Sequence, residues 1–175
     1  MPAKRFVKEL NAQIGREFAA SQQYVAAAVY YDEQTLPRLA SFFYEQAKEE
    51  RTHAMMMVRY LIDVGTPPTI PGVDAPRTTF KGFLEPIELA LKQEREVGAQ
   101  ISELVGIARD EKDYLSEQFV QWFLKEQIEE VATMSSLLDV AKRAGDQALL
   151  VEEFLARDGM RPEGADPTAP EAAGE

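Results

Sequence analysis

The sequence predicts an all-α fold: a four-helix bundle with a long crossover between its second and third helices and a short fifth helix at the end. Two observations lead to this prediction. Four long stretches carry apolar residues at 3- and 4-residue steps, which is the spacing of one face of an α-helix. Each apolar stripe is interrupted near its middle by carboxylate, histidine or amide side chains. The interior of the bundle is therefore where we expect the chemistry of this protein.

The first two helices are expected at about residues 4–32 and 37–64. Proline disfavours helical geometry in the residue before it, so Pro37 separates the two helices. Proline also suits the first turn of a helix, so the second helix can begin at Pro37 itself. Gly65 and the prolines that follow it end this helix.

The segment 65–81 is expected to be an ordered crossover loop, because it contains four prolines in 17 residues and has no helical periodicity. A helix of about 28 residues is roughly 40 Å long, whereas 17 extended residues reach at most about 55 Å. The loop is therefore long enough to cross the whole bundle. This length predicts that the second and third helices run parallel.

The third and fourth helices are expected at about 82–109 and 112–143. Pro86 is compatible with the third helix only because it lies near the first turn. Gly145 follows the fourth helix and is expected to serve as its C-cap.

A short fifth helix is expected from Asp146 to about Arg157. Its narrow apolar face consists of Leu149, Leu150 and Phe154. A helix of this length is not stable alone in water, so it must dock on the bundle. We expect one domain over residues 1–157, followed by a tail at 158–175. The tail is rich in proline, glycine, alanine and acids, a composition typical of disorder.

The composition excludes several kinds of protein. The chain has no cysteine, so disulfides, thiolate zinc sites and cysteine-ligated iron–sulfur clusters are excluded. A formal charge of −11 argues against a nucleic-acid partner and favours cations. No apolar run is long enough to span a membrane, and the N-terminus lacks the apolar core of a signal peptide. We therefore expect a cytoplasmic protein that interacts with no membrane.

Several polar side chains interrupt the apolar stripes near mid-bundle, including Gln46 on the second stripe, and six of them are candidate ligands. These six are Glu17 on the first helix, Glu50 and His53 on the second, Glu94 on the third, and Gln127 and Glu130 on the fourth. An ionised carboxylate in an apolar interior is costly unless it is paired or bound to a cation, so this layer predicts a metal site. Oxygen-rich ligands with one histidine suit Fe²⁺, Fe³⁺ or Mn²⁺ better than copper.

Four segments of the chain resemble prokaryotic non-haem ferritins, most closely those of actinobacterial type: REFAASQQYVAAAVYY, FYEQAKEERTHAMMM, ALKQERE and QWFLKEQIEEVA. The resemblance covers about residues 4–157. Ferritin-like di-iron and di-manganese proteins place one glutamate on each of two helices and Glu-x-x-His on each of the other two. Glu50 and His53 fit this pattern. The fourth helix departs from it, because Gln127 and Glu130 occur there without a second histidine.

The resemblance implies a ferroxidase centre that holds two iron ions. The first iron would be bound by Glu17, Glu50 and His53. The second would be bound by Glu94 and Glu130, with Glu50 bridging the two ions.

The resemblance also implies roles for residues around this centre. Gln127 would help to position oxygen species, and Tyr24 would be a hydrogen-bond partner and electron donor beside the centre. A third iron site toward the interior of the protein shell would be formed by Glu49, Glu126 and Glu129. The alternatives are a buried structural amide for Gln127, core packing for Tyr24, and an ordinary solvated surface for the three acids.

The family's subunit has five helices, and 24 copies assemble into a hollow shell with octahedral symmetry. The resemblance implies that the fifth helix lines the four-fold channels of this shell through Leu149, Leu150 and Phe154. It implies that iron enters through three-fold channels near the start of the fourth helix. The candidates for lining these channels are Glu117, Asp113 and Gln121.

Two positions argue against haem. Bacterioferritins carry a haem-binding methionine where this chain has Arg51, and a histidine where it has Glu130. The expected function is therefore iron storage and detoxification: a ferroxidase that oxidises Fe²⁺ with O₂ or H₂O₂ and stores a ferric mineral in a homo-oligomeric shell. The alternatives are a di-iron or di-manganese oxidase acting on a small organic substrate, and a structural bundle without metal.

Overall fold

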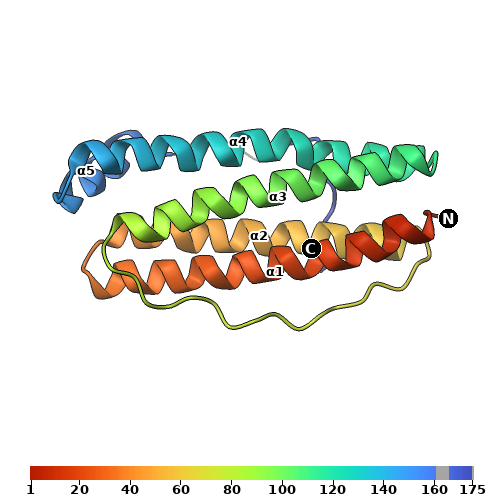
Figure 1. Ribbon diagram of the computed structural model, residues 1–175, viewed down its shortest axis with the longest axis horizontal. Coiled ribbons are helices and arrows are strands. Elements are labelled where there is room, and N and C mark those ends of the chain that lie inside the picture. Colours follow the sequence, from red (N-terminus) through yellow and green to blue (C-terminus); the bar gives the residue numbers. More distant parts are fainter. Residues whose placement is uncertain (161–165, 175) are drawn as a thin grey trace.

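The computed structural model describes residues 1–160 and 166–174, and within these ranges all regular structure is helical. The helices are α1 (Lys4–Glu33), α2 (Pro37–Asp63), α3 (Leu84–Asp110), α4 (Tyr114–Ala144) and α5 (Ala148–Asp158). Four long helices form the bundle, and α5 lies across one end of it (Figure 1). The prediction of an all-α four-helix bundle with a short fifth helix is thus confirmed, with helix ends within about two residues of those expected.

The loop between α2 and α3 runs along the length of the bundle, so that α2 and α3 are parallel, as its length predicts (Figure 1). Side chains of α1 form hydrogen bonds with backbone groups of the loop. The side-chain oxygen of Asn11 accepts a hydrogen bond from the backbone N–H of Thr69 at 2.6 Å. Gln23 pairs with Arg77 through two bonds of 2.8 Å, donating to its carbonyl and accepting from its N–H. The loop is therefore ordered by polar contacts with α1.

Gly15 of α1 allows the same loop to approach closely. A Cβ at this position would lie 2.6 Å from Cγ of Pro71 and 3.6 Å from its Cβ. We expect Gly15→Ala to destabilise the fold by about 1 kcal/mol, because the overlap outweighs the better helix propensity of alanine. Adding Pro71→Ala removes the clashing atom and is expected to make Gly15→Ala stabilising. Thermal unfolding of the two single variants and the double variant measures this coupling, which additive effects would disprove.

The fourth helix begins two residues later than the sequence predicts. Lys112 has φ of 56°, a left-handed conformation that cannot continue a helix. Asp113 then acts as the N-cap, because its carboxylate accepts a hydrogen bond from the backbone N–H of Ser116. The same carboxylate accepts from the backbone N–H of Ala3 at 2.9 Å and so ties the N-terminus to this corner.

The fifth helix docks on the bundle, as its length requires, and the contact is made by Val151. Val151 is fully buried between α2 and α4, whereas Leu149 and Leu150 are 68% and 46% exposed. Leu149 and Leu150, which the resemblance assigns to the four-fold channels, thus lie outside this contact. The carboxylate of Glu152 accepts hydrogen bonds of 2.8 Å from the first backbone N–H groups of α2, including that of Leu39. These donors have no partner within their own helix.

The core consists of two apolar clusters separated by a polar layer. One cluster surrounds Phe6, Leu10 and Ile101 near the N-terminus, and the other surrounds Tyr31 and Phe43 near α5. On every long helix the buried acids or histidine lie between the residues of the two clusters. The apolar packing on both sides therefore fixes which helical face presents the polar layer.

Part of the C-terminal tail, where composition predicts disorder, lies along the bundle. The carboxylate of Asp166 accepts hydrogen bonds from the indole N–H of Trp122 at 3.2 Å and from Lys125 at 3.0 Å. Further on, the backbone N–H of Ala173 donates to the carbonyl of Met55 at 3.1 Å. The described part of the tail thus spans α4 and α2, while residues 161–165 and 175 of the predicted tail lie outside the described residues. In the parts of the chain that are described, no helix is apolar and long enough to cross a membrane.

Candidate metal centre

Five ligand-type side chains from the four long helices are buried at the middle of the bundle. All are at most 8% exposed: Glu17 of α1, Glu50 and His53 of α2, Glu94 of α3 and Glu130 of α4. The residues of α2 project from one face because they are three positions apart, just under one helical turn. The backbone therefore brings four carboxylates and one imidazole into a single layer.

Three of these side chains form a tight group. Glu17, Glu50 and His53 each offer one ligand atom, and these atoms lie within 4.8 Å of one another. Gln13, one turn before Glu17, donates a hydrogen bond of 2.8 Å to one oxygen of its carboxylate. The other oxygen of Glu17 is buried and has no partner among the described residues. A cation between the three side chains would supply the missing partner.

Glu94 is held from two sides on the other half of the layer. The hydroxyl of Tyr24 on α1 donates to one of its carboxylate oxygens. The amide of Gln127 on α4 donates to the other at 2.6 Å and to the Glu94 backbone carbonyl at 2.9 Å. Tyr24 and Gln127, both predicted to lie beside the centre, thus fix the orientation of this carboxylate.

The electrostatics of the layer favour protons or cations. Burial, followed by the nearby carboxylates of Glu94 and Glu17, raises the pKa of Glu50 well above its ordinary value. Burial raises the pKa of Glu94 from 4.5 to about 7, although the hydrogen bonds from Tyr24 and Gln127 act in the opposite direction. Burial lowers the pKa of His53, which favours the neutral imidazole that can bind a metal. A bound cation would replace the protons and relieve the repulsion between the acids.

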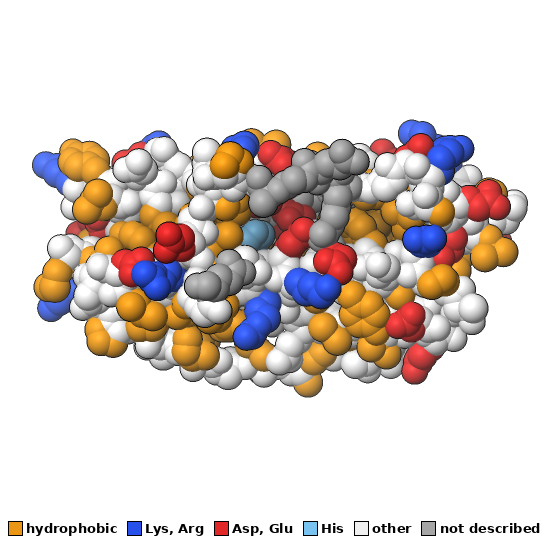
Figure 2. Space-filling model, turned by 180° about the vertical axis from the view of Figure 1, so that it is seen from behind, with side chains coloured by type: hydrophobic (Ala, Val, Ile, Leu, Met, Phe, Trp, Pro, Cys, Tyr) orange, Lys and Arg blue, Asp and Glu red, His pale blue; other side chains and the backbone are white. Residues whose placement is uncertain are grey.

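His53 and Glu130 also lie on the wall of a cavity of about 630 Å³ between α2, α4 and the tail. The other polar residues on this wall include Gln46, Glu49, Glu126, Glu129 and Asp166. In Figure 2 the single histidine is visible in a hollow beside acidic side chains. Burial and repulsion from Glu129 and Glu49 raise the pKa of Glu126. The three acids expected to form a third site therefore surround one cavity next to the buried layer.

Packing accounts for the aromatic residues beside the histidine. Trp122 and Phe123 both make edge contacts with the His53 ring, at centroid distances of 5.8 and 5.7 Å. Gln13 was not among the predicted site residues, although its place one turn before Glu17 on the same helical face could have revealed it. Gln46 is on the predicted stripe, but its contact with Glu49 depends on the side-chain conformations.

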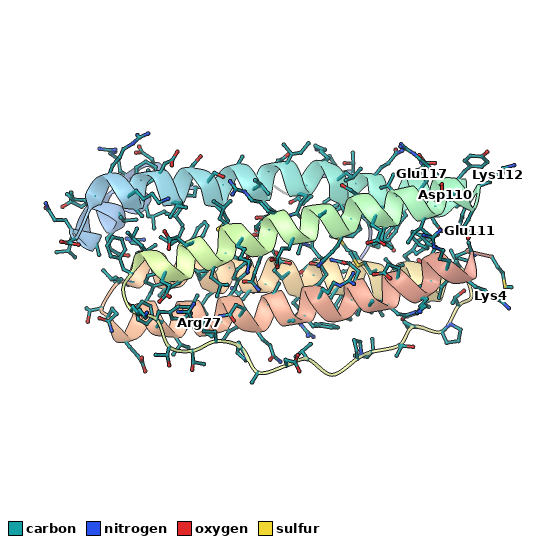
Figure 3. The ribbon with its side chains drawn as sticks, in the orientation of Figure 1. Lys4, Arg77, Asp110, Glu111, Lys112 and Glu117 are labelled. Carbon is teal, nitrogen blue, oxygen red and sulfur yellow. The ribbon has the colours of Figure 1, made fainter. Side chains whose placement is uncertain are left out.

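The channel candidates lie at the opposite end of α4 from α5. Figure 3 labels Glu117 there, near Asp110 and Glu111. The carboxylate of Glu117 pairs with the guanidinium of Arg109 at 2.6 Å and accepts a longer bond of 3.3 Å from Gln121. Asp113 is used for helix capping, as described above. Any channel at this corner would thus present an acid that is already paired with arginine.

Known proteins that resemble this chain are ferritins, in agreement with the buried layer of carboxylates and histidine. The family model for ferritin, described as a ferritin-like domain, matches residues 7–144. The chain is 53% identical over 170 residues to Ferritin BfrB of Mycolicibacterium smegmatis, a match covering 97% of this chain and 93% of the relative. It is 37% identical over 161 residues to a bacterial non-heme ferritin of Staphylococcus epidermidis, covering 90% and 97% of the two chains.

Solved structures show the same likeness. An open pore ferritin of the archaeon Archaeoglobus fulgidus superposes with a TM-score of 0.85 at 29% sequence identity. The match covers 91% of this chain and 99% of the archaeal one. A humanized archaeal ferritin gives a TM-score of 0.87 at 26% identity.

Proposed function

The chain belongs to the ferritin family, and we propose that it is an iron-storage ferroxidase. In this proposal it oxidises Fe²⁺ to Fe³⁺ with O₂ or H₂O₂ and keeps the product as a ferric mineral inside a shell of 24 identical copies. The observation that carries the proposal is the buried layer at mid-bundle, where Glu17, Glu50 and His53 bring ligand atoms within 4.8 Å of one another.

The proposed roles are those that the resemblance implies, and the burial of the side chains in one layer supports them. Glu17, Glu50 and His53 would bind the first iron, and Glu94 and Glu130 the second. Glu50 would bridge the ions, and the repulsion it feels from Glu17 and Glu94 supports a place between the two halves of the layer. Carboxylates suit this work because hard oxygen ligands bind both Fe²⁺ and Fe³⁺. Holding the ions close and offsetting their charge is the catalytic contribution of the protein.

Tyr24 and Gln127 would act on the second ion. Both donate hydrogen bonds to Glu94, so they hold its carboxylate in one orientation. Because Tyr24 contacts a proposed ligand directly, we propose that it can also supply an electron to the centre. Gln127 would help to position the oxidant.

The cavity favours storage over oxidation of an organic substrate. A di-iron or di-manganese oxidase needs an apolar cavity beside its metals to bind its substrate. Here the cavity beside His53 has several acids on its wall, among them Glu49, Glu126 and Glu129, together with two lysines and a few apolar side chains. Such walls suit the passage of iron ions from the centre.

Aerobic titration of the purified metal-free protein with Fe²⁺ tests the proposal. Absorbance follows the ferric product, and size-exclusion chromatography measures the particle that retains it. We expect a large particle that retains far more iron than the centre and the cavity acids can bind, and a Glu50→Ala, His53→Ala variant that loses rapid oxidation. A small oligomer that takes up only the ions of the centre would refute storage and favour the oxidase.

A further inference from the structure

Gln46 lies between the buried centre and the acidic cavity. It is on α2, one turn before Glu50, and its side chain is part of the cavity wall that includes His53 and Glu130. The residue is only 3% exposed. An amide buried so deeply normally satisfies both its donor and its acceptor.

The orientation of the Gln46 amide follows from its neighbour. The amide group contacts the carboxylate of Glu49, and a carboxylate that is ionised can only accept hydrogen bonds. The amide nitrogen must therefore face Glu49, and the oxygen takes the other direction. That oxygen is buried and has no hydrogen-bond partner among the described residues.

The surroundings of Gln46 favour a cation as the missing partner. Glu49, Glu126 and Glu129 line the same cavity as Gln46. Amide and carboxylate oxygens are hard donors of the kind that iron ions accept. A neutral amide adds a donor atom without adding charge, and the number of charged ligands tunes how tightly a cation is held.

We propose that the side-chain oxygen of Gln46 binds iron ions as they pass between the buried centre and the acids of the cavity. The amide nitrogen at the same time holds the carboxylate of Glu49, while the amide oxygen adds a neutral donor beside the charged donors of the cavity wall. Because the amide carries no charge, the ion is released more readily than from a site with carboxylates alone. This inference rests on the proposed function, and it assigns to Gln46 a role separate from those of the ligands of the centre.

Terbium luminescence tests this binding without relying on catalysis. Tb³⁺ is a hard trivalent probe, and Trp122, the single tryptophan, lies on the wall of the same cavity and can sensitise it. The assembled metal-free protein is titrated with Tb³⁺ while tryptophan is excited. We expect Gln46→Leu to weaken the sensitised binding about tenfold or more, as loss of a supporting group typically does at metal sites. Gln46→Glu keeps an oxygen donor and is expected to retain the binding.

Gln100→Leu is the matched control, because the amide oxygen of Gln100 on α3 is also buried without a described partner but is not on this cavity wall. Its Tb³⁺ binding is expected to equal that of the wild type. If Gln46→Leu fails to fold by circular dichroism and particle size, Gln46→Asn, which withdraws the oxygen by one carbon, takes its place. Binding by the Leu or Asn variant with wild-type affinity would overturn the proposal, as would equal loss in Gln46→Glu.

Aerobic Fe²⁺ oxidation by the wild type separates this inference from the proposed function. Loss of sensitised Tb³⁺ binding in Gln46→Leu, together with a wild type that oxidises no iron, would support the cation site and refute the ferroxidase. Unchanged Tb³⁺ binding in Gln46→Leu, together with a wild type that oxidises and stores iron, would refute the role of Gln46 alone.

Discussion

Replacing Glu50 by glutamine is expected to lower the initial rate of Fe²⁺ oxidation by about 100-fold or more, since even supporting residues at metal sites are worth 10- to 100-fold. Glu50 is the carboxylate on which burial and its acidic neighbours act together, and in the proposed centre it bridges both ions. An amide has nearly the same shape but carries no charge, so it cannot replace the bridge. Stopped-flow absorbance of the ferric product measures the rate.

Two further variants make this result specific. Glu94→Gln removes a carboxylate from the second position only, so a titration with Mn²⁺ is expected to retain binding at the group formed by Glu17, Glu50 and His53. Glu103→Gln changes an exposed acid of α3 and is expected to leave rate and binding unchanged. An oxidation rate of Glu50→Gln within a few-fold of the wild type would refute the proposed centre.

A triple variant distinguishes the metal centre from a structural bundle without metal. Buried acids that bind no cation destabilise a fold, and replacing them by well-packed apolar residues is often stabilising. Triple replacement of Glu17, Glu50 and Glu94 by leucine is thus compatible with a stable bundle under either function. Only a metal centre requires that iron binding and oxidation disappear with the acids.

The positions of the polar layer could be predicted from the sequence because the register of each helix is fixed by apolar residues on both sides. Glu94, for example, lies between Ala90 and Val97 on one stripe, and all three are buried. A shift of one position would have exposed the whole stripe. The fold and the residues of the layer therefore follow from periodicity and from the length of one loop.

Features that depend on contacts between segments far apart in the sequence could not be predicted from periodicity. The docking face of α5 is set by the surfaces of α2 and α4, and it uses Val151, which is not part of the apolar face predicted from the sequence. The close approach of Pro71 to Gly15 depends on the path of the loop. Asp166 reaches Trp122 from a segment whose composition is typical of disorder, because composition contains no information on a surface that binds it.

The stability of the metal-free protein is expected to fall as the pH rises from about 4.5 to about 7. Glu94 has a pKa near 4.5 when unfolded and about 7 in the native state, so the native state binds the proton more tightly. Its contribution to stability is complete below the unfolded pKa and is lost as the pH rises through the folded value. The contribution amounts to about 3 kcal/mol, and Glu50, whose pKa is also raised, acts in the same direction.

Thermal unfolding of metal-free protein at about pH 5 and about pH 7.5 measures this effect, with Glu94→Gln as the matched variant. His53 acts in the opposite direction, because burial lowers its pKa and its contribution is lost as the pH falls. The difference between wild type and Glu94→Gln removes this term and those of the shared groups that do not interact with Glu94. Loss of the Glu94 charge also lowers the pKa of Glu50, which changes the difference in the same direction. We expect the wild type to lose more stability than the variant between the two pH values, and Mn²⁺ to abolish the difference, since a bound cation stabilises the ionised carboxylate. Equal pH dependence in the two metal-free proteins would show that Glu94 is ionised in the native state without a cation, and the electrostatic argument for a metal at this position would fail.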